Sequence, residues 1–232
     1  MNYPHSPDFP CTLFFEDQHL IVLSKPAGLL SQGEHRGDPN LVDELRTYLG
    51  RHYVGLIHRL DRNTSGIMIV AKRTKSAQRL TTALQAGKIF RSYLAWVQGS
   101  LTQKTRWSHF LKKDPKQNLV KVVSPQGKEG EKQAILTVQP IQSGFWKQAQ
   151  ITLVEFILET GRSHQIRVQS AFEGFPLLGD IKYNPKGIAY SRVALHSHRL
   201  EFPHPMSGET LKFIDPLPED LAVLNSFKNP AF

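Results

Sequence analysis

Apolar residues lie along the chain in short runs separated by polar turns, a pattern typical of β-strands. The runs Leu13–Phe15 and Leu20–Leu23 flank a four-residue polar turn, so we predict a β-hairpin near the amino terminus. Four later runs are rich in β-branched or aromatic residues. These further predicted strands cover Ile67–Val70, residues 90–99, Ala134–Gln139 and Ala149–Glu159.

Two segments show helical spacing instead. In residues 41–50, Leu41 and Leu45 share one face, Asn40 is suited to the N-cap position and Gly50 to the end. Residues 74–87 also have apolar side chains on one face, with Thr74 as the predicted cap and a glycine as the stop. We expect the first helix to be structural.

The composition is that of a soluble, folded protein, with 232 residues, of which 40% are hydrophobic and 21% charged. We predict a loose arm over residues 1–11, which contain three prolines, and a single domain over residues 12–232. Cys11 is the sole cysteine, so no intrachain disulfide forms, and the first residues do not resemble a secretory signal. No apolar run is long enough to span a bilayer. We therefore expect a cytoplasmic protein.

Positive charge is concentrated in two regions. The formal net charge is +9 and the pI is about 9.7, which favours a polyanionic partner. Residues 58–91 contain eight lysines and arginines against one acid, and residues 101–133 contain eight more. The first excess favours RNA as the partner. For the second segment we predict a basic hairpin or flap that lies on RNA phosphates, with a solvated loop as the alternative.

The segment 58–72, HRLDRNTSGIMIVAK, places one carboxylate between two arginines. Asp61 lies between Arg59 and Arg62, and a polar turn leads from it into an apolar strand. A nearby cation favours the ionised carboxylate, so we expect Asp61 to be charged. Taken alone, the pattern favours a surface ion pair beside a solvated turn.

The order H-R-L-D-x-x-T-S-G, apolar strand, Ala-Lys resembles the signature of the RluA family of RNA pseudouridine synthases. Five further segments resemble the family's other motifs in the same order, although taken alone the first is a plain strand-ending turn. They are KPAGLL at 25–30, R-S-Y at 91–93 for the usual K-x-Y, GRSHQIRV at 161–168, FPLLGDIKYN at 175–184 and ALHSHRLEFPHP at 194–205, where Ser197 replaces the usual Ala. The resemblance covers about residues 13–221, and no S4-like module precedes it, so we expect the catalytic domain alone.

The resemblance implies an α+β fold with a mixed, largely antiparallel central sheet, flanking helices and an active-site cleft across its middle. It implies that Asp61 is catalytic, that Arg167 pairs with it and that Tyr93 stacks on the target uracil. Arg59 would fill the gap left by the flipped nucleotide, and Ile166 would pack on the uracil ring. The remaining predicted substrate-binding residues are Arg62, Thr64, Arg162 and His164. For GRSHQIRV the alternative is the start of an amphipathic helix with Ser163 as its cap, and both interpretations can hold together.

The reaction of this family breaks the N1–C1′ bond, rotates the uracil and rejoins it through C5, so the base must leave its stack. One ionised carboxylate suffices, either as a nucleophile on the sugar or as a base at C2′, and both routes stay open. No cofactor, metal or nucleotide is implied, and the sequence lacks P-loop and G-x-G-x-x-G patterns. We expect a monomer that acts on a tRNA arm or an rRNA stem-loop.

Three alternatives follow from the same residues. An RNA-binding protein without catalysis would have the same basic surface, although it would be expected to lose Asp61, Tyr93 or Arg167. A glycosidase normally needs two paired carboxylates, and the motif contains one. Zinc binding by His196 and His198 would need a third ligand, for which His204 is the one candidate.

Overall fold

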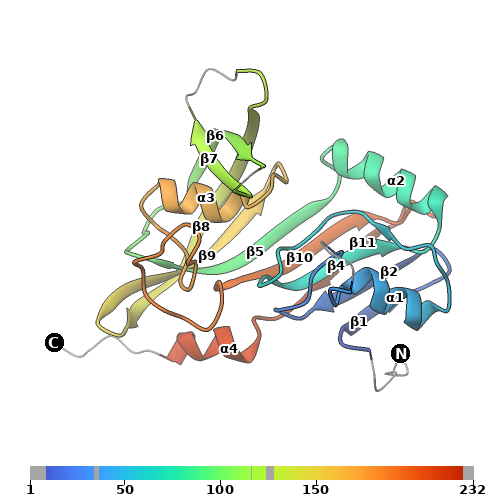
Figure 1. Ribbon diagram of the computed structural model, residues 1–232, viewed down its shortest axis with the longest axis horizontal. Helices are drawn as coiled ribbons and strands as arrows, with labels where there is room; N and C mark the ends of the chain where they lie inside the picture. Colours follow the sequence, from blue (N-terminus) through green and yellow to red (C-terminus); the bar gives the residue numbers. More distant parts are fainter. Residues whose placement is uncertain (1–8, 34–36, 116, 124–127, 227–232) are drawn as a thin grey trace. The chain divides into compact units, whose positions relative to one another are not determined.

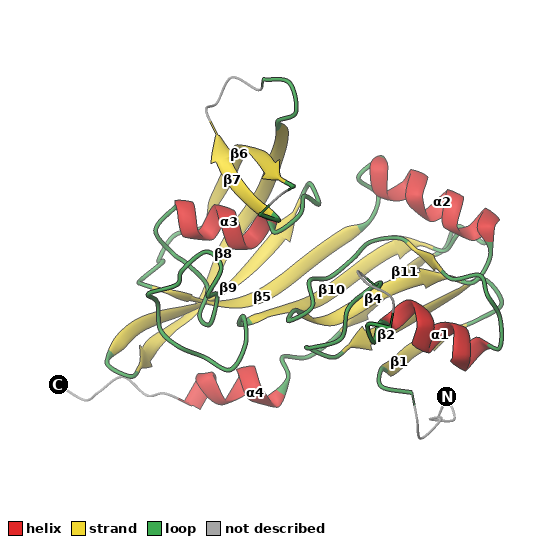
Figure 2. Ribbon diagram, viewed as in Figure 1, coloured by secondary structure: helices red, strands yellow, loops and turns green. Residues whose placement is uncertain are grey.

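The computed structural model describes residues 9–33, 37–115, 117–123 and 128–226 (Figures 1 and 2). The elements in chain order are β1 (Thr12–Glu16), β2 (Leu20–Lys25), α1 (Leu41–Leu49), β3 (Gly55–Leu56), β4 (Ser65–Ala71), α2 (Thr74–Gln85), β5 (Phe90–Gln98), β6 (Thr105–Asp114), β7 (Leu119–Val123), β8 (Lys132–Trp146), β9 (Ala149–Leu158), α3 (Gln165–Phe172), β10 (Leu195–Pro203), β11 (Thr210–Ile214), α4 (Glu219–Ala222) and the 3-10 helix η1 (Val223–Ser226). The chain divides into two compact units. Unit 1 consists of residues 1–91 and 197–216, and unit 2 of residues 92–196 and 217–232.

Unit 1 is built on strands in the order β1-β2-β4-β10, with β3 beside β4 and β11 beside β10. The strands β1 and β2 form the predicted antiparallel hairpin, and β2 pairs with β4 in antiparallel register from Leu20 opposite Ala71 to Lys25 opposite Gly66. The helices α1 and α2 accompany these strands (Figure 1). The predicted strand at residues 67–70 and both predicted helices are therefore confirmed.

The core of unit 1 forms between its central strands and α2. Ile67 and Ile69 of β4 pack with Leu20 and Val22 of β2 and with Leu80 of α2. Every residue of β4 is buried, as expected for an apolar, β-branched central strand. Each fully buried aliphatic side chain of this kind contributes roughly 1.5–3 kcal/mol relative to an exposed one. This core fixes the strand that follows the Asp61 motif.

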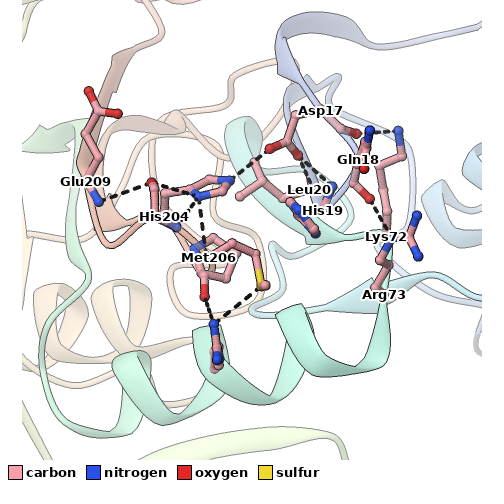
Figure 3. A network of polar contacts seen from close by, with 12 residues as sticks. Asp17, Gln18, His19, Leu20, Lys72, Arg73, His204, Met206 and Glu209 are labelled. Atoms are coloured by element: carbon pink, nitrogen blue, oxygen red, sulfur yellow. Dashed lines mark hydrogen bonds and ion pairs between the residues drawn. The ribbon is translucent and has the colours of Figure 1, made fainter.

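A polar network joins three turns at one end of unit 1 (Figure 3). Asp17, in the β1–β2 turn, accepts hydrogen bonds from the backbone N–H groups of His19 and Leu20 at 2.7 and 2.8 Å. Its other carboxylate oxygen accepts from Nε2 of His204 at 2.8 Å, which connects it to the β10–β11 turn. Nζ of Lys72, just before α2, donates to the carbonyl oxygen of Asp17 at 2.6 Å. The network therefore ties the ends of β2, β4 and β10 together.

Unit 2 is built on strands in the order β5-β9-β8-β6-β7, each paired antiparallel with the next. Figure 2 shows α3 beside the β6–β7 hairpin. The predicted strand over residues 134–139 is too short, because β8 runs from Lys132 to Trp146. A register shift between Pro140 and Gln142 lets the strand continue past a residue that has no N–H to donate.

Two predicted caps are wrong. Thr74 is the first residue of α2, and the N-cap residue is Arg73, which makes no side-chain capping bond. The helix α3 begins at Gln165, with His164 rather than Ser163 at the N-cap position. His164 has a left-handed backbone with φ of 52°, so the chain enters this helix through a tight turn rather than through a hydroxyl cap.

The predicted α+β class is confirmed, because helices accompany a sheet in which most strand pairs are antiparallel. The predicted single domain and the cleft stay predictions. In the predicted arm, residues 1–8 lie outside the described residues and Cys11 is buried. Among the described residues, no helix is both long and apolar enough to cross a membrane.

Candidate active site

Asp61 lies in a tight turn that leads into β4. The carbonyl oxygen of Asp61 accepts a hydrogen bond from the N–H of Thr64 at 3.0 Å, which closes the turn. Thr64 is buried, Asp61 is half-buried, and Arg59 and Arg62 are exposed. Unit 1 thus gathers four predicted site residues in one short loop, with its two arginines accessible to solvent.

The backbone on both sides of Asp61 is held by the segment that follows β2. The hydroxyl of Ser31 accepts from the N–H of Leu60 at 3.0 Å and donates to its carbonyl oxygen at 2.7 Å. The carbonyl oxygen of Arg62 accepts from the N–H of Gly28 at 2.8 Å and from Nζ of Lys25 at 3.3 Å. Lys25 is fully buried and also donates to two carbonyls of its own loop at 2.7 and 2.8 Å. The first motif is therefore more than a strand-ending turn, because the motif holds the residue after Asp61, and Ser31, directly behind the motif, holds the residue before it.

Contacts between β4 and β10 explain the glycine at the end of the Asp61 motif and the serine at position 197. Gly66 has φ of 116°, and a Cβ atom there would lie 2.2 Å from the carbonyl oxygen of Ser197 in β10. A side chain at this position is therefore excluded by both backbone conformation and space. Ser197, the departure from the family's usual Ala, donates its hydroxyl proton to the carbonyl oxygen of Ile67 at 3.0 Å.

His58, the first residue of the motif, is a neutral structural group. Its Nε2 accepts a hydrogen bond from the N–H of Ile69 at 3.2 Å, and the ring is buried. Burial, followed by the nearby charge of Arg91, lowers the pKa of His58 to about 3. The ring therefore stays uncharged at physiological pH and braces the loop against β4.

Unit 2 contains the other predicted site residues. Tyr93 lies on β5, opposite Phe156 of β9, and is buried. Ile166 and Arg167 lie in the first turn of α3 and are also buried. Burial of an arginine requires hydrogen-bonding partners, because the guanidinium remains charged.

The turn before α3 places the remaining two residues. Arg162 is exposed, and its Nε donates to the carbonyl oxygen of Gln133 at 2.9 Å. The backbone N–H of Arg162 donates to Oε1 of Gln165 at 2.9 Å. Nδ1 of His164 is hydrogen-bonded to the hydroxyl of Tyr183 at 2.7 Å. His164 and Arg162 are therefore tied to different neighbours, one to the later loop and the other to β8.

Arg167 has a buried partner that the sequence analysis did not assign. Its Nε and Nη2 donate to the two carboxylate oxygens of Asp180 at 2.8 and 2.7 Å. Tyr183 lies beside the same guanidinium. Asp180 and Tyr183 both belong to the family motif G-D-x-x-Y, and this motif could have pointed to them in the sequence. The pairing of Arg167 with Asp61 stays a prediction, since these residues belong to different units.

The basic segment contains the predicted hairpin, and its register places two lysines side by side. Lys112 of β6 lies directly opposite Lys121 of β7, and both are exposed. Like charges directly opposite each other destabilise a strand pair. The charge of Arg106, near the start of β6, is instead compensated by a two-bond ion pair with Glu159 at 2.7 and 2.8 Å. Lys116, also part of the predicted flap, lies outside the described residues.

No group of three or more His, Cys, Asp or Glu side chains within the described part of the chain could hold a metal ion. Nδ1 of His198 is hydrogen-bonded to the carbonyl oxygen of Asp215 at 2.7 Å. Nothing in these residues therefore supports the alternative of a zinc site.

Comparison with known proteins decides the family. Residues 19–172 match the model of the RNA pseudouridylate synthase family. The chain belongs to this family. The predicted RluA-type recognition is confirmed, and with it the enzyme class, an isomerase that converts uridine in RNA to pseudouridine.

Named relatives resemble the chain over most of its length. It is 34% identical to "Ribosomal large subunit pseudouridine synthase D" of Xanthomonas campestris, over 94% of this chain and 70% of that protein. It is 33% identical to the protein of the same name from Vibrio cholerae, over 92% and 69%. An uncharacterized RNA pseudouridine synthase of Bacillus subtilis is 32% identical, over 95% and 77%.

Two solved structures share the fold of this pseudouridine synthase. "Human RNA Pseudouridylate Synthase Domain Containing 1" matches with a TM-score of 0.74 at 20% identity, over 99% of this chain and all of that one. "Human RNA Pseudouridylate Synthase Domain Containing 4" matches with a TM-score of 0.73 at 21% identity, over 91% and 90%. At these identities the likeness supports the fold alone.

Proposed function

We propose that this pseudouridine synthase modifies a uridine in a stem-loop of large-subunit ribosomal RNA, with Asp61 as its catalytic carboxylate. The names of the relatives in Xanthomonas campestris and Vibrio cholerae support this choice of RNA. A tRNA arm is the alternative substrate. The protein would act as a monomer in the cytoplasm, where ribosomal RNA is modified.

The observation that carries the role of Asp61 is the way in which its loop is held. Ser31 fixes both backbone polar groups of Leu60, and Lys25 fixes the carbonyl of Arg62. A catalytic group needs such support, since a small displacement of a reacting group reduces the rate strongly. A carboxylate that only formed a surface ion pair would need no buried lysine and serine behind its loop.

In the proposed reaction the target nucleotide is flipped out, and Arg59 fills the space it leaves. Arg167 pairs with Asp61, while Tyr93 and Ile166 contact the two faces of the uracil. Arg62, Thr64, Arg162 and His164 contact the RNA around the target. The N1–C1′ bond breaks, a C5–C1′ bond forms, and the proton on C5 is lost while N1 gains one, so the isomerisation is balanced.

The test compares Asp61→Asn with Glu209→Gln, an exposed carboxylate in the β10–β11 turn of the same unit. Pseudouridines are mapped in ribosomal and transfer RNA from cells that lack the gene and are supplied with each variant. We expect Glu209→Gln to restore every missing site and Asp61→Asn to restore none, with RNA affinity in vitro unchanged. Restored modification by Asp61→Asn would show that Asp61 takes no part in the chemistry. If cells that lack the gene lose pseudouridines from tRNA alone, the substrate is tRNA and not ribosomal RNA.

A further inference from the structure

The turn from Gly179 to Tyr183 is built around the carboxylate of Asp180. Asp180 accepts two hydrogen bonds from Arg167, and the exposed fractions of the two side chains are 1% and 10%. Its Oδ1 also accepts from the backbone N–H groups of Lys182 and Tyr183 at 3.2 and 3.3 Å. A buried ion pair is tolerated when further hydrogen bonds satisfy its oxygens, and here the turn itself supplies them. The carboxylate therefore fixes the arginine and the turn together.

Tyr183 approaches the same arginine from a second direction. The guanidinium carbon of Arg167 lies 5.2 Å from the centre of the Tyr183 ring, within range of a cation–π interaction. The Tyr183 hydroxyl is hydrogen-bonded to Nδ1 of His164 at 2.7 Å and accepts from the N–H of Val120 at 3.1 Å. The ring is thereby anchored at its far end, which limits the movement of the arginine above it.

The same turn is attached to the start of β7 in the basic hairpin. Nζ of Lys182 donates to the carbonyl oxygen of Asn118 at 2.6 Å, two residues before the Val120 N–H that Tyr183 holds. Val120 also packs with Val168, the residue after Arg167 in α3. Hydrogen bonds thus join the hairpin to the turn that contains Tyr183. Apolar packing joins the hairpin to α3, the helix that carries Arg167.

We infer that Asp180 and Tyr183 are positioning residues for Arg167, and that Tyr183 fixes the arginine relative to the basic hairpin. The inference rests on the proposed function, in which Arg167 serves Asp61. RNA phosphates held by Lys112 and Lys121 then have a fixed position relative to the guanidinium of Arg167, because Tyr183 connects the hairpin to this arginine. The family motif G-D-x-x-Y receives a physical role, which is to hold the guanidinium and not to contact RNA.

The deciding variant is Tyr183→Phe, which keeps the ring beside Arg167 and removes both hydrogen bonds of the hydroxyl. Its matched control is Tyr190→Phe, which removes a hydroxyl that donates to the carbonyl oxygen of Asp220 in the same unit. The measurements are the single-turnover rate at saturating enzyme, the RNA affinity and the melting temperature. The substrate is unmodified large-subunit ribosomal RNA transcribed in vitro.

We expect Tyr183→Phe to lower the saturated rate about 10- to 100-fold, because small displacements of a reacting group have effects of this size. Its affinity should match the wild type, and its melting temperature should fall no more than that of Tyr190→Phe, which keeps the full rate. Equal rates for the two variants would overturn the inference. Asp180→Asn should lower the saturated rate further, since an amide offers one acceptor oxygen instead of two, and an unchanged rate would remove Asp180 from the proposal.

A second measurement separates this inference from the proposed function. The Nε–H of Arg167 is buried against Asp180, so it should give a slowly exchanging NMR signal, assigned by its loss in Arg167→Lys. Tyr183→Phe should shift this signal and speed its exchange, while Tyr190→Phe should leave it unchanged. A wild-type protein that forms no pseudouridine would contradict the proposed function alone. An Arg167 signal unaffected by Tyr183→Phe would contradict the positioning role.

Discussion

A single hydroxyl, that of Ser31, satisfies both backbone polar groups of Leu60, accepting from its N–H at 3.0 Å and donating to its carbonyl at 2.7 Å. Leu60 precedes Asp61, and all three hydrogen-bonding groups are buried. The residues are 29 positions apart, so this contact exists only in the folded chain. It gives the loop of the proposed catalytic carboxylate a fixed backbone without contributing any charge.

Ser31→Ala should therefore destabilise the protein and slow its reaction. The substitution leaves a buried N–H and a buried carbonyl of Leu60 without this partner, at a cost of roughly 1–3 kcal/mol in unfolding free energy. The control is Ser76→Ala in α2, whose buried hydroxyl has no hydrogen-bond partner among the described residues. Urea unfolding should show the loss for Ser31→Ala and little or none for Ser76→Ala. Equal stabilities would show that the loop is held by other contacts.

Arg167→Leu should lower both stability and activity. It removes the partner of the buried carboxylate of Asp180, a change that costs roughly 3–5 kcal/mol when a buried pair is broken from one side. Arg167→Lys keeps the charge but loses the two-bond geometry, so its loss of stability should be smaller while its rate stays low. Thermal unfolding and single-turnover rates separate the two effects. Wild-type activity in either variant would remove Arg167 from the proposed site.

The network around Asp17 should make the stability of the protein depend on acid pH (Figure 3). Burial opposes ionisation of Asp17, but hydrogen bonds from His19, Leu20 and His204 outweigh it, so the pKa of Asp17 is lowered. A lowered folded pKa gives stability that is present above the unfolded value of about 3.9 and is lost as pH falls through the folded value. The melting temperature of wild type should exceed that of Asp17→Asn at pH 6, and the gap should close below about pH 4. A gap that is independent of pH would contradict this assignment.

Replacing Lys112 and Lys121 together by glutamine should weaken binding to every RNA alike, because phosphate contacts carry no base information. If both contact phosphates, the slope of log affinity against log salt should flatten by about 1.4–1.8. Arg106→Gln is the control, since its charge is already paired with Glu159, and its slope should stay near the wild-type value. Identical slopes for the double variant and wild type would mean that the hairpin is a solvated loop.

The sequence predicted local structure well where apolar and polar side chains follow the period of a strand or a helix, and where a motif follows the order known from the family. The β1–β2 hairpin, the buried strand β4 and the helix capped by Asn40 all follow from the residues themselves. The length of β8 did not, because Pro140 interrupts the apolar pattern while pairing with β9 carries the strand onward. The start of α3 was misplaced because a left-handed residue, His164, leaves no side-chain signature.

The site was predicted as a set of residues rather than as a set of contacts. Family motifs pointed to Asp61 and Arg167, but not to the buried residues that hold the loop of Asp61 and the side chain of Arg167. Asp180 is 13 residues from Arg167, and the fold, not the spacing, brings the two side chains together. Lys25 was likewise noted only as part of a turn, since no pattern in a sequence announces that a lysine will be fully buried.

Because Lys112 and Lys121 lie opposite each other, dissolved salt should have two opposite effects on the β6–β7 hairpin. In the free protein, Lys112 and Lys121 repel each other across the β6–β7 pair, and dissolved ions screen this repulsion. Raising the ionic strength should therefore protect the hairpin amides from hydrogen exchange while it weakens RNA binding. In the proposed complex, RNA phosphates beside Lys112 and Lys121 would relieve the same repulsion, so the hairpin would gain part of its rigidity from its own substrate.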